Sequence, residues 1–410
     1  MTFNFPLFLR MAHRAFLRSA GTPARLTRQR FLFLVIFYLV WPIGSLCIWL
    51  GFLLDDILFP GYRKQPVERP LFILGNFRSG STFLHRLLSR DRGNFTSLTT
   101  WDIYLAPSVT AKKLMQLIGR LDRLVGAPLR RLALAFDQRT LGRVQIHHIS
   151  FFEPEEDENI LMHTWSTYFI TFLFPFLDSM PAYQYFDDAL SEKEKLRIFA
   201  FYKSMLQRHL YATGARHFVS KSPAFCGKIE TLSQIFPDAR ILYLIRTPLD
   251  MLPSTISWIN YARRYFADPG PGYHYLDEIV QMTQYWYRHP LAFLDANPSN
   301  RHRIVQYDDL IEDPEGVVRS FYAQFDYPPP EALSAMVQRA VVDTRATRSV
   351  HSYSYEAMGF TRPQIEDLYA DIFARFNFRH GRHHIDTAAG RDTELELDAA
   401  AAAADLPALE

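Results

Sequence analysis

The chain has 410 residues, of which 48% are hydrophobic and 21% charged, so it can bury one large core or two smaller ones. This composition excludes a chain that is disordered throughout, and only two cysteines exclude a disulfide-built scaffold. The 45 cationic and 43 anionic side chains leave a net charge of +2, which gives no overall attraction to nucleic acid. The charges are unevenly placed, because six arginines lie in residues 1–30 and no acidic residue precedes Asp55.

Residues 1–30 form a basic amphipathic segment. On a helical wheel five apolar side chains share one arc and three arginines share the other: Phe8, Met11, Ala12, Ala15 and Phe16 against Arg10, Arg14 and Arg18. This is the pattern of a helix that lies among lipid headgroups.

Residues 31–59 predict a membrane-spanning or re-entrant apolar segment. The stretch from Phe31 to Leu54 carries no charge in 24 residues, and at about 1.5 Å per residue a helix of that length crosses a hydrocarbon core of about 30 Å. A straight span would place the arginines in the cytoplasm and the rest of the chain outside. Pro42 and Gly44 would allow a hairpin with both ends inside, and a third reading is a helix packed on the globular domain.

Residues 66–385 predict an α/β domain. Strand-like runs alternate with helix-like ones in this order: strand 71–74, helix 82–89, strand 217–220, helix 228–236, strand 240–245 and strand 304–307. Ser191 and Glu194 form a capping box that opens another helix. Such alternation predicts a P-loop-like parallel sheet flanked by helices, behind the N-terminal membrane-associated helical segment. Residues 386–410 turn Ala-rich and acidic, and we expect a disordered tail.

A phosphate-binding loop follows the first strand. Residues 75–82 read GNFRSGST, which fits the pattern G-x-x-x-x-G-K-[ST] except that Ser81 replaces the lysine. Backbone amides and a helix N-terminus can still bind a phosphate there, and the cation moves to Arg78. The strand 240–245 ends in Arg246 where a nucleotide triphosphatase would need an acidic residue for Mg²⁺. The loop therefore suits a nucleotide with an additional phosphate and no metal.

Two further elements follow strand ends. Arg246 lies eight residues before Ser254, about two helical turns, so both could reach one phosphate group. Lys221 directly follows the strand 217–220 and would point into the crevice where parallel sheets bind ligands.

These three elements, in this order, resemble the nucleotide-binding signature of sulfotransferases that use 3′-phosphoadenosine-5′-phosphosulfate (PAPS). The resemblance covers residues 68–380 and includes the stretches 154–158 (PEEDE), 307–310 (YDDL) and 351–356 (HSYSYE), which are similar to a large bacterial branch of the family. It implies that the 5′-phosphosulfate is bound by Arg78, Ser79, Gly80, Ser81 and Thr82. It also implies that Arg246 and Ser254 bind the 3′-phosphate, with PAPS as co-substrate and no metal.

The catalytic base is expected to be a carboxylate. Cytosolic sulfotransferases place a histidine two residues after the lysine that matches Lys221, but this chain has Pro223 there, as do tyrosylprotein and heparan sulfotransferases, which use a glutamate. The candidates are Glu156 and Glu158, then Asp102, with His147, His148 and His163 as alternatives. Clustered acids would raise one pKa by mutual repulsion, although the same cluster could be a solvated loop or pair with structural arginines. Lys221 is expected to neutralise charge on the leaving oxygen.

The acceptor is expected to be a small or lipid-like hydroxyl compound. Residues 165–177 read WSTYFITFLFPFL, which could line an apolar acceptor pocket or belong to the core. A bacterial enzyme would meet PAPS in the cytoplasm, so we expect a membrane-associated protein whose catalytic domain faces that side; a eukaryotic source would favour a lumenal domain behind one span. Two alternatives remain: an ATP- or GTP-dependent kinase, and a non-catalytic membrane protein that kept the fold.

Overall fold

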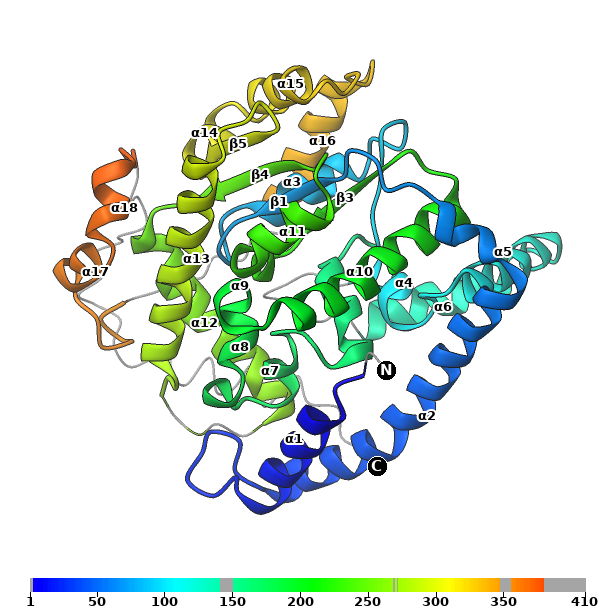
Figure 1. The fold of residues 1–410 in the computed structure, drawn as a ribbon, viewed down its shortest axis with the longest axis horizontal. Coiled ribbons are helices and arrows are strands. Elements are labelled where there is room, and N and C mark those ends of the chain that lie inside the picture. The colour runs from blue at the N-terminus through cyan, green and yellow to red at the C-terminus, as the bar shows by residue number, and fades with distance from the viewer. Residues whose placement is uncertain (1–2, 141–149, 268–269, 271, 347–354, 380–410) are drawn as a thin grey trace.

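The structure, a computed structural model, describes residues 3–140, 150–267, 270, 272–346 and 355–379. Its centre is a five-stranded sheet in the order β2-β3-β1-β4-β5, and all neighbouring strands are parallel (Figure 1). The strands are β1 (Leu71–Leu74), β2 (Phe95–Thr96), β3 (His217–Lys221), β4 (Arg240–Ile245) and β5 (His302–Gln306). The predicted α/β fold with a parallel sheet flanked by helices is confirmed.

Helices cover both faces of this sheet because its strands are apolar on both faces. Leu71 and Ile73 of β1 face a core built with α3, α15 and α16, whereas Phe72 and Leu74 face a larger core that includes α10, α11 and α13. The bounds of these helices are α3 (Ser81–Leu88), α10 (Glu192–Thr213), α11 (Ile229–Ile235), α13 (Leu276–Ala296), α15 (Pro314–Phe325) and α16 (Leu333–Ala346). The predicted capping box of Ser191 and Glu194 opens α10.

The remaining elements are shorter or peripheral. Before β3 they are α1 (Phe5–Leu17), α2 (Arg28–Leu58), η1 (Pro60–Lys64), α4 (Thr100–Tyr104), α5 (Val109–Leu124), α6 (Pro128–Arg139), η3 (Asp157–Thr164), α7 (Ile170–Leu173), η4 (Leu177–Ser179), α8 (Pro181–Gln184) and α9 (Phe186–Ala189). After β3 they are η5 (Pro223–Lys228), α12 (Pro248–Phe266), α14 (Tyr307–Glu312), α17 (Arg362–Leu368) and α18 (Ala370–Arg375).

The register places the carboxyl ends of the strands at one edge of the sheet. Ile73 of β1 pairs with Lys221 of β3, Leu74 pairs with Tyr243 of β4, and Ile245 pairs with Gln306 of β5. The loop after β1, Lys221 and Arg246 therefore come from adjacent strand ends, where open parallel sheets bind ligands.

The N-terminal helices contact the domain, as in the third of the readings that the sequence allowed. The apolar arc of α1 faces protein and not a headgroup layer, because Met11 and Ala15 are fully buried and the Phe8 ring lies 4.7 Å from that of Trp165. Helix α2 continues through Pro42 without the hairpin turn that Pro42 and Gly44 would have allowed.

The aromatic run at residues 165–177 belongs to the core. Trp165, Tyr168 and Phe174 are each at most 1% exposed, and the rings of Trp165 and Phe174 contact Phe37 of α2. These side chains therefore join the α/β domain to α2. The run belongs to the core, which was one of its two expected roles, and does not line an acceptor pocket.

Candidate active site

The loop between β1 and α3 is shaped by two glycines. At Gly75 a Cβ atom would lie 2.5 Å from the carbonyl oxygen of Leu244, so only glycine lets the loop pass the end of β4. At Gly80 the backbone is left-handed (φ +88°), and a Cβ would lie 2.8 Å from the ring of Tyr307. Ser79 Oγ donates to the carbonyl of Asn76 at 2.7 Å, which closes the loop. Ser81 and Thr82 begin α3, so backbone amides and the helix N-terminus are available to an anion.

Arg78, Arg246 and Ser254 meet in one hydrogen-bonded chain. Arg246 donates to the carbonyl oxygen of Arg78 at 2.9 Å, and Arg78 Nε donates to Ser254 Oγ at 3.0 Å. Arg246 follows β4 and Ser254 lies two turns into α12, as their spacing predicted. The residues implied for the two ends of the donor are therefore in direct contact.

Two tyrosines hold Arg246. Its guanidinium lies 4.4 Å from the centre of the Tyr307 ring, and its backbone carbonyl accepts a hydrogen bond from the Tyr287 hydroxyl at 2.6 Å. Neither tyrosine was a predicted site residue, although Tyr307 opens the YDDL stretch that the resemblance included. The close approach of the Tyr307 ring to Gly80 links the start of α14 to the phosphate loop.

Lys221 and Glu156 form an ion pair at the end of β3. The distance from Lys221 Nζ to Glu156 Oε1 is 2.6 Å, and their side chains are 2% and 10% exposed. Asp157 supports this pair, because it accepts hydrogen bonds from the Lys221 backbone amide at 3.0 Å and from Ser220 Oγ at 2.9 Å. Burial raises the pKa of Asp157 to about 7, although the hydrogen bonds from Tyr202 and Ser220 act to lower it.

Glu158 lies on the other side of the acidic cluster. It is fully buried, pairs with the equally buried Lys228, and accepts a hydrogen bond from the Thr167 hydroxyl. Burial raises the pKa of Glu158, and Lys228 opposes that rise. The main cause is therefore loss of solvent and not the repulsion between acids that the sequence suggested. Glu156 and Glu158 are neither solvated nor paired with arginines, since Glu156 pairs with Lys221 and Glu158 with Lys228.

The third carboxylate, Asp102, and His163 have other partners. Asp102 is the acidic member of a capping box with Thr99 and forms an ion pair with Lys112. Burial would raise the pKa of Asp102, but the charge of Lys112, together with further contributions that include hydrogen bonds from Lys112 and Thr99, lowers the pKa below its usual value. His163 is buried with its ring bonded to the carbonyl of Ile103 at 2.7 Å. His147, His148 and residues 351–354 lie outside the described residues.

His85 is a neighbour of Lys221 that the sequence analysis missed. It lies on the buried face of α3, one turn after Thr82, and is 1% exposed. Burial, and next the charge of Lys221, lower the pKa of His85 to about 3, so it is neutral. The sequence could have indicated this residue, because His85 lies three residues after Thr82 and so falls on the apolar face of the expected helix.

The polar atoms at this edge fit a ligand with several anionic groups. Arg246 Nε and Ser222 Oγ are buried and have no hydrogen-bond partner among the described residues. Together with Lys221 and the loop amides they could bind phosphate or sulfate oxygens. In the described part of the chain no group of three or more His, Cys, Asp or Glu side chains could hold a metal ion.

Comparison with known proteins agrees with this geometry. The profile described as "Sulfotransferase family" matches residues 70–332, which is more than half of the chain. The chain is 26% identical over 317 residues to the omega-hydroxy-beta-dihydromenaquinone-9 sulfotransferase Stf3 of Mycobacterium bovis and to that of Mycobacterium tuberculosis. Each alignment covers 70% of this chain and 76% of the relative.

Solved structures share the fold. Sulfotransferase STF1 of Mycobacterium tuberculosis superposes with a TM-score of 0.66 at 19% identity, covering 90% of this chain and 92% of that one. Sulfotransferase STF9 of Mycobacterium avium superposes with a TM-score of 0.65 at 20% identity, covering 92% and 97%. With the family profile matched across the sheet, the loop, Lys221 and Arg246, this chain belongs to the sulfotransferase family.

Proposed function

We propose that this protein transfers a sulfuryl group from PAPS to the hydroxyl of a lipid-like acceptor. The observation that carries the proposal is the Lys221–Glu156 ion pair at the strand edge that also presents the phosphate loop and Arg246. In this pair Lys221 would stabilise the leaving group, and the adjacent Glu156 carboxylate would accept the proton of the acceptor hydroxyl.

The donor is assigned to the edge formed by β1, β3 and β4. The loop amides, Arg78 and Thr82 would bind the 5′-phosphosulfate, with Ser79, Gly80 and Ser81 supplying the loop backbone. Arg246 and Ser254 would bind the 3′-phosphate. Because Arg78 contacts both Arg246 and Ser254, the two ends of the donor would be bound by one connected set of side chains.

The transfer is an in-line displacement at sulfur. A carboxylate accepts the acceptor's hydroxyl proton, the acceptor oxygen forms a bond to sulfur, and the bond from sulfur to the bridging oxygen breaks. Lys221 compensates the charge that develops on that oxygen. Glu156 is our choice for the base because it contacts Lys221 and keeps some exposure, whereas Glu158 is fully buried against Lys228. Asp102 is not our choice, because its carboxylate already caps α4 and pairs with Lys112.

A lipid-like acceptor is supported by one relative and by the apolar surface of α2. The named substrate of Stf3 is a hydroxylated dihydromenaquinone, which is an alcohol on a long apolar chain. Helix α2 is long and apolar enough to cross a membrane, and only 6% of its most apolar 18-residue stretch is buried in the protein. We place the protein at the membrane with its catalytic domain facing the cytoplasm, where PAPS is made in bacteria.

Calorimetry with 3′,5′-adenosine bisphosphate tests the donor. The bisphosphate should bind without Mg²⁺, and Arg246→Ala should weaken binding by about 2 kcal/mol, roughly thirtyfold, because a charge-assisted bidentate contact is lost. Arg301→Ala is the matched control, since Arg301 is exposed and precedes β5 at the opposite edge of the sheet. A preference for Mg-ATP would support a kinase instead, and no binding of either nucleotide would support a non-catalytic relic.

A second assay tests the acceptor. The protein should transfer ³⁵S from labelled PAPS to a long-chain alcohol presented in detergent micelles. Transfer to a water-soluble sugar or a tyrosine peptide in preference to the long-chain alcohol would refute the lipid-like acceptor and leave the donor assignment intact.

A further inference from the structure

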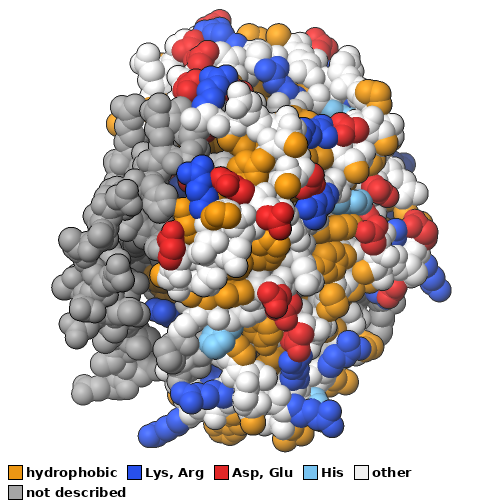
Figure 2. Space-filling view, turned by 90° about the vertical axis from the view of Figure 1, so that its left-hand side faces the viewer, with side chains coloured by type: hydrophobic (Ala, Val, Ile, Leu, Met, Phe, Trp, Pro, Cys, Tyr) orange, Lys and Arg blue, Asp and Glu red, His pale blue; other side chains and the backbone are white. Residues whose placement is uncertain are grey.

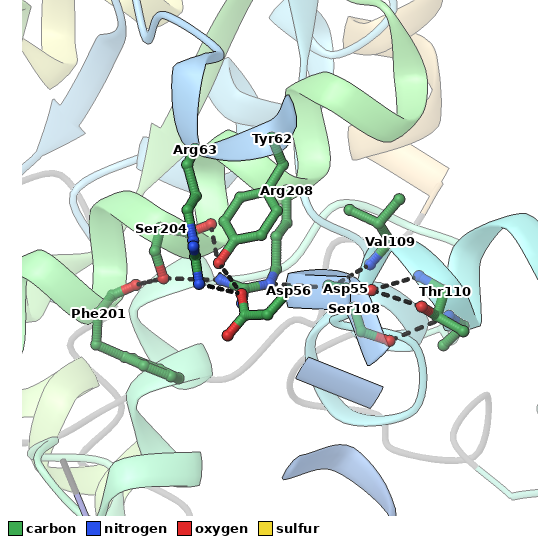
Figure 3. A network of polar contacts seen from close by, with 11 residues as sticks. Asp55, Asp56, Tyr62, Arg63, Ser108, Val109, Thr110, Phe201, Ser204 and Arg208 are labelled. Atoms are coloured by element: carbon green, nitrogen blue, oxygen red, sulfur yellow. Dashed lines mark hydrogen bonds and ion pairs between the residues drawn. The ribbon is translucent and has the colours of Figure 1, made fainter. Parts of the chain in front are cut away.

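Helix α2 is attached to the catalytic domain near both of its ends. At its start Arg30, which is 2% exposed, donates hydrogen bonds to the backbone carbonyls of Phe266 and Leu173. Near its end Asp55 is fully buried and accepts hydrogen bonds from the Thr110 amide at 2.7 Å and from Arg208 Nε at 2.9 Å (Figure 3). Pulling Asp55 away would leave the buried charge of Arg208 without this carboxylate, and pulling Arg30 away would leave two backbone carbonyls without their donor. Both changes are destabilising.

This attachment fixes the direction of α2 relative to the domain. Arg30 and Asp55 are 25 residues apart, a rise of about 37 Å along a helix, which exceeds a hydrocarbon core of about 30 Å. A helix bound at both ends to one folded body lies along that body, as Figure 1 shows for α2. It cannot cross a bilayer while the domain stays in water. The side of α2 turned away from the domain is nevertheless apolar, with exposed Leu32, Leu39, Ile43, Leu46, Leu50 and Leu53.

The helical hairpin α5–α6 adjoins α2 and also exposes apolar side chains. It starts beside α2, since a Cβ on Gly51 would lie 2.7 Å from the Oγ of Ser108, the N-cap residue of α5. The hairpin exposes apolar side chains that include Leu117, Leu121, Leu124, Leu129, Leu132 and Phe136. Leu124 is 81% exposed, more than any other large hydrophobic residue among those described.

The charges on α5–α6 are sorted by sign. Its two acidic residues are buried: Asp122 caps α6 by accepting from the amides of Leu129 and Arg130, and Asp137 accepts from Ser150 Oγ. Its exposed charged side chains are all basic, namely Lys113, Arg120, Arg123, Arg130, Arg131 and Arg139. Apolar side chains bordered only by cations are what an anionic lipid surface binds.

The opposite side of the molecule differs. Figure 2 looks onto the side of α17 and α18, where acidic and basic side chains lie next to each other. Exposed ion pairs there join Arg288 to Asp371 at 2.8 Å and Arg375 to Asp295 at 2.5 Å. The exposure of basic side chains without acidic ones is therefore a property of the α5–α6 side and not of the whole surface.

We infer that α2 and the α5–α6 hairpin form one docking surface that binds an anionic bilayer, with α2 lying in the plane of the membrane and not crossing it. This inference goes beyond the sulfuryl transfer proposed above and does not depend on it, because it rests on the surface alone. It also rejects both the straight span and the hairpin for residues 31–59 in favour of an interfacial helix.

Vesicle co-sedimentation of the full chain, freed of detergent, tests the surface. Vesicles of equal parts phosphatidylcholine and phosphatidylglycerol should bind the protein at least tenfold more tightly than phosphatidylcholine alone. The triple variants Leu117→Asn/Leu121→Asn/Leu124→Asn and Arg123→Gln/Arg130→Gln/Arg131→Gln should each lose at least tenfold. Ile311→Asn/Val342→Asn is the matched control, because it removes exposed apolar side chains from other helices and should change nothing.

Two results would overturn the docking surface. One is vesicle binding that neither triple variant weakens. The other is a dimer that does not bind vesicles and that the leucine variant converts to a monomer, which would make the patch a contact between copies. None of these readouts uses PAPS or turnover, so failure here is distinguishable from failure of the sulfotransferase proposal.

The depth of α2 tests its orientation. Cys47 is exposed on α2 and Cys226 is buried, so a fluorophore can be attached at Cys47, or at Leu32→Cys or Ile57→Cys in a Cys47→Ser background. Nitroxide lipids labelled near the headgroup should quench all three sites alike. A helix that crosses the bilayer would instead place the label at Cys47 deepest, and that pattern would refute the in-plane orientation.

Discussion

The pair of Glu158 and Lys228 offers a test that separates structure from catalysis. Both side chains are 0% exposed, and Glu158 also accepts from Thr167, while the Lys228 ammonium lies 5.2 Å from the centre of the Phe186 ring. Replacing Glu158 by Gln keeps the volume and the contact with Thr167 but leaves the ammonium of Lys228 buried without a counter-charge. Replacing Lys228 by Met removes that charge as well.

The expected magnitudes follow from this burial. Breaking a buried pair from one side costs about 3–5 kcal/mol, whereas replacing both partners with neutral groups of similar volume is close to neutral. With a urea dependence of about 3 kcal/mol per molar, Glu158→Gln should lower the unfolding midpoint by about 1–1.7 M. The double variant Glu158→Gln/Lys228→Met should recover at least half of that loss.

Urea unfolding followed by tryptophan fluorescence measures these midpoints, and a ³⁵S-PAPS assay on the same samples measures turnover. The folded double variant should keep turnover within about fivefold of the parent, since Glu158 is not the proposed base. Two results would refute the reasoning: a shift below about 0.3 M for Glu158→Gln, or a stable double variant without turnover, which would make Glu158 catalytic.

Four further outcomes are expected. Lys221→Ala should lower kcat by about 10²–10³ in the PAPS assay, and unchanged turnover would remove Lys221 from the mechanism. Glu156→Gln should lower kcat by about 10²–10⁴ while calorimetry finds unchanged affinity for the bisphosphate; a loss of affinity with normal kcat would assign it to binding. Gly80→Ala should weaken bisphosphate binding at least tenfold because its Cβ meets Tyr307, whereas Gly214→Ala, with φ +69° and open space, should not. The pKa of Asp157 is about 7 in the folded state, above its unfolded value of about 3.9, so the folded state binds the proton more tightly. The free energy of unfolding should therefore fall as pH rises from about 4 to 7, by at most about 1.4 kcal/mol per pH unit. In urea unfolding Asp157→Asn should flatten that slope, and an unchanged slope would show that other groups cause it.

The central sheet could be predicted because its strands are short and two of its inner ones carry apolar runs, LFIL in β1 and ILYLI in β4. Strands β1 and β4 have the predicted bounds, and β5 ends one residue earlier than expected because Tyr307 begins α14. The edge strand β2 was missed, since two residues carry no periodicity and its pairing with β3 depends on chain more than 100 residues away.

The candidate site was predictable where a residue ends a strand, as Lys221 does, or directly follows one, as Arg246 does. Lys221, Arg246 and the loop at residues 75–82 lie at strand ends because parallel neighbours bring those ends together. The partners of the acidic cluster were not predictable. Glu156 and Glu158 are two residues apart in sequence, and only tertiary packing assigns one to Lys221 and the other to Lys228.

The attachment of α2 also has a consequence for synthesis of the chain. Its partners Leu173, Arg208 and Phe266 are made after the helix itself, and Phe266 follows Leu58 by about two hundred residues. At about 5–20 residues per second the ribosome needs roughly 10–40 seconds to cover that interval. During this time a long apolar helix has left the ribosome without part of the surface on which it packs in the folded chain. The nascent chain must therefore be kept from the insertion machinery until the domain that receives the helix has been translated.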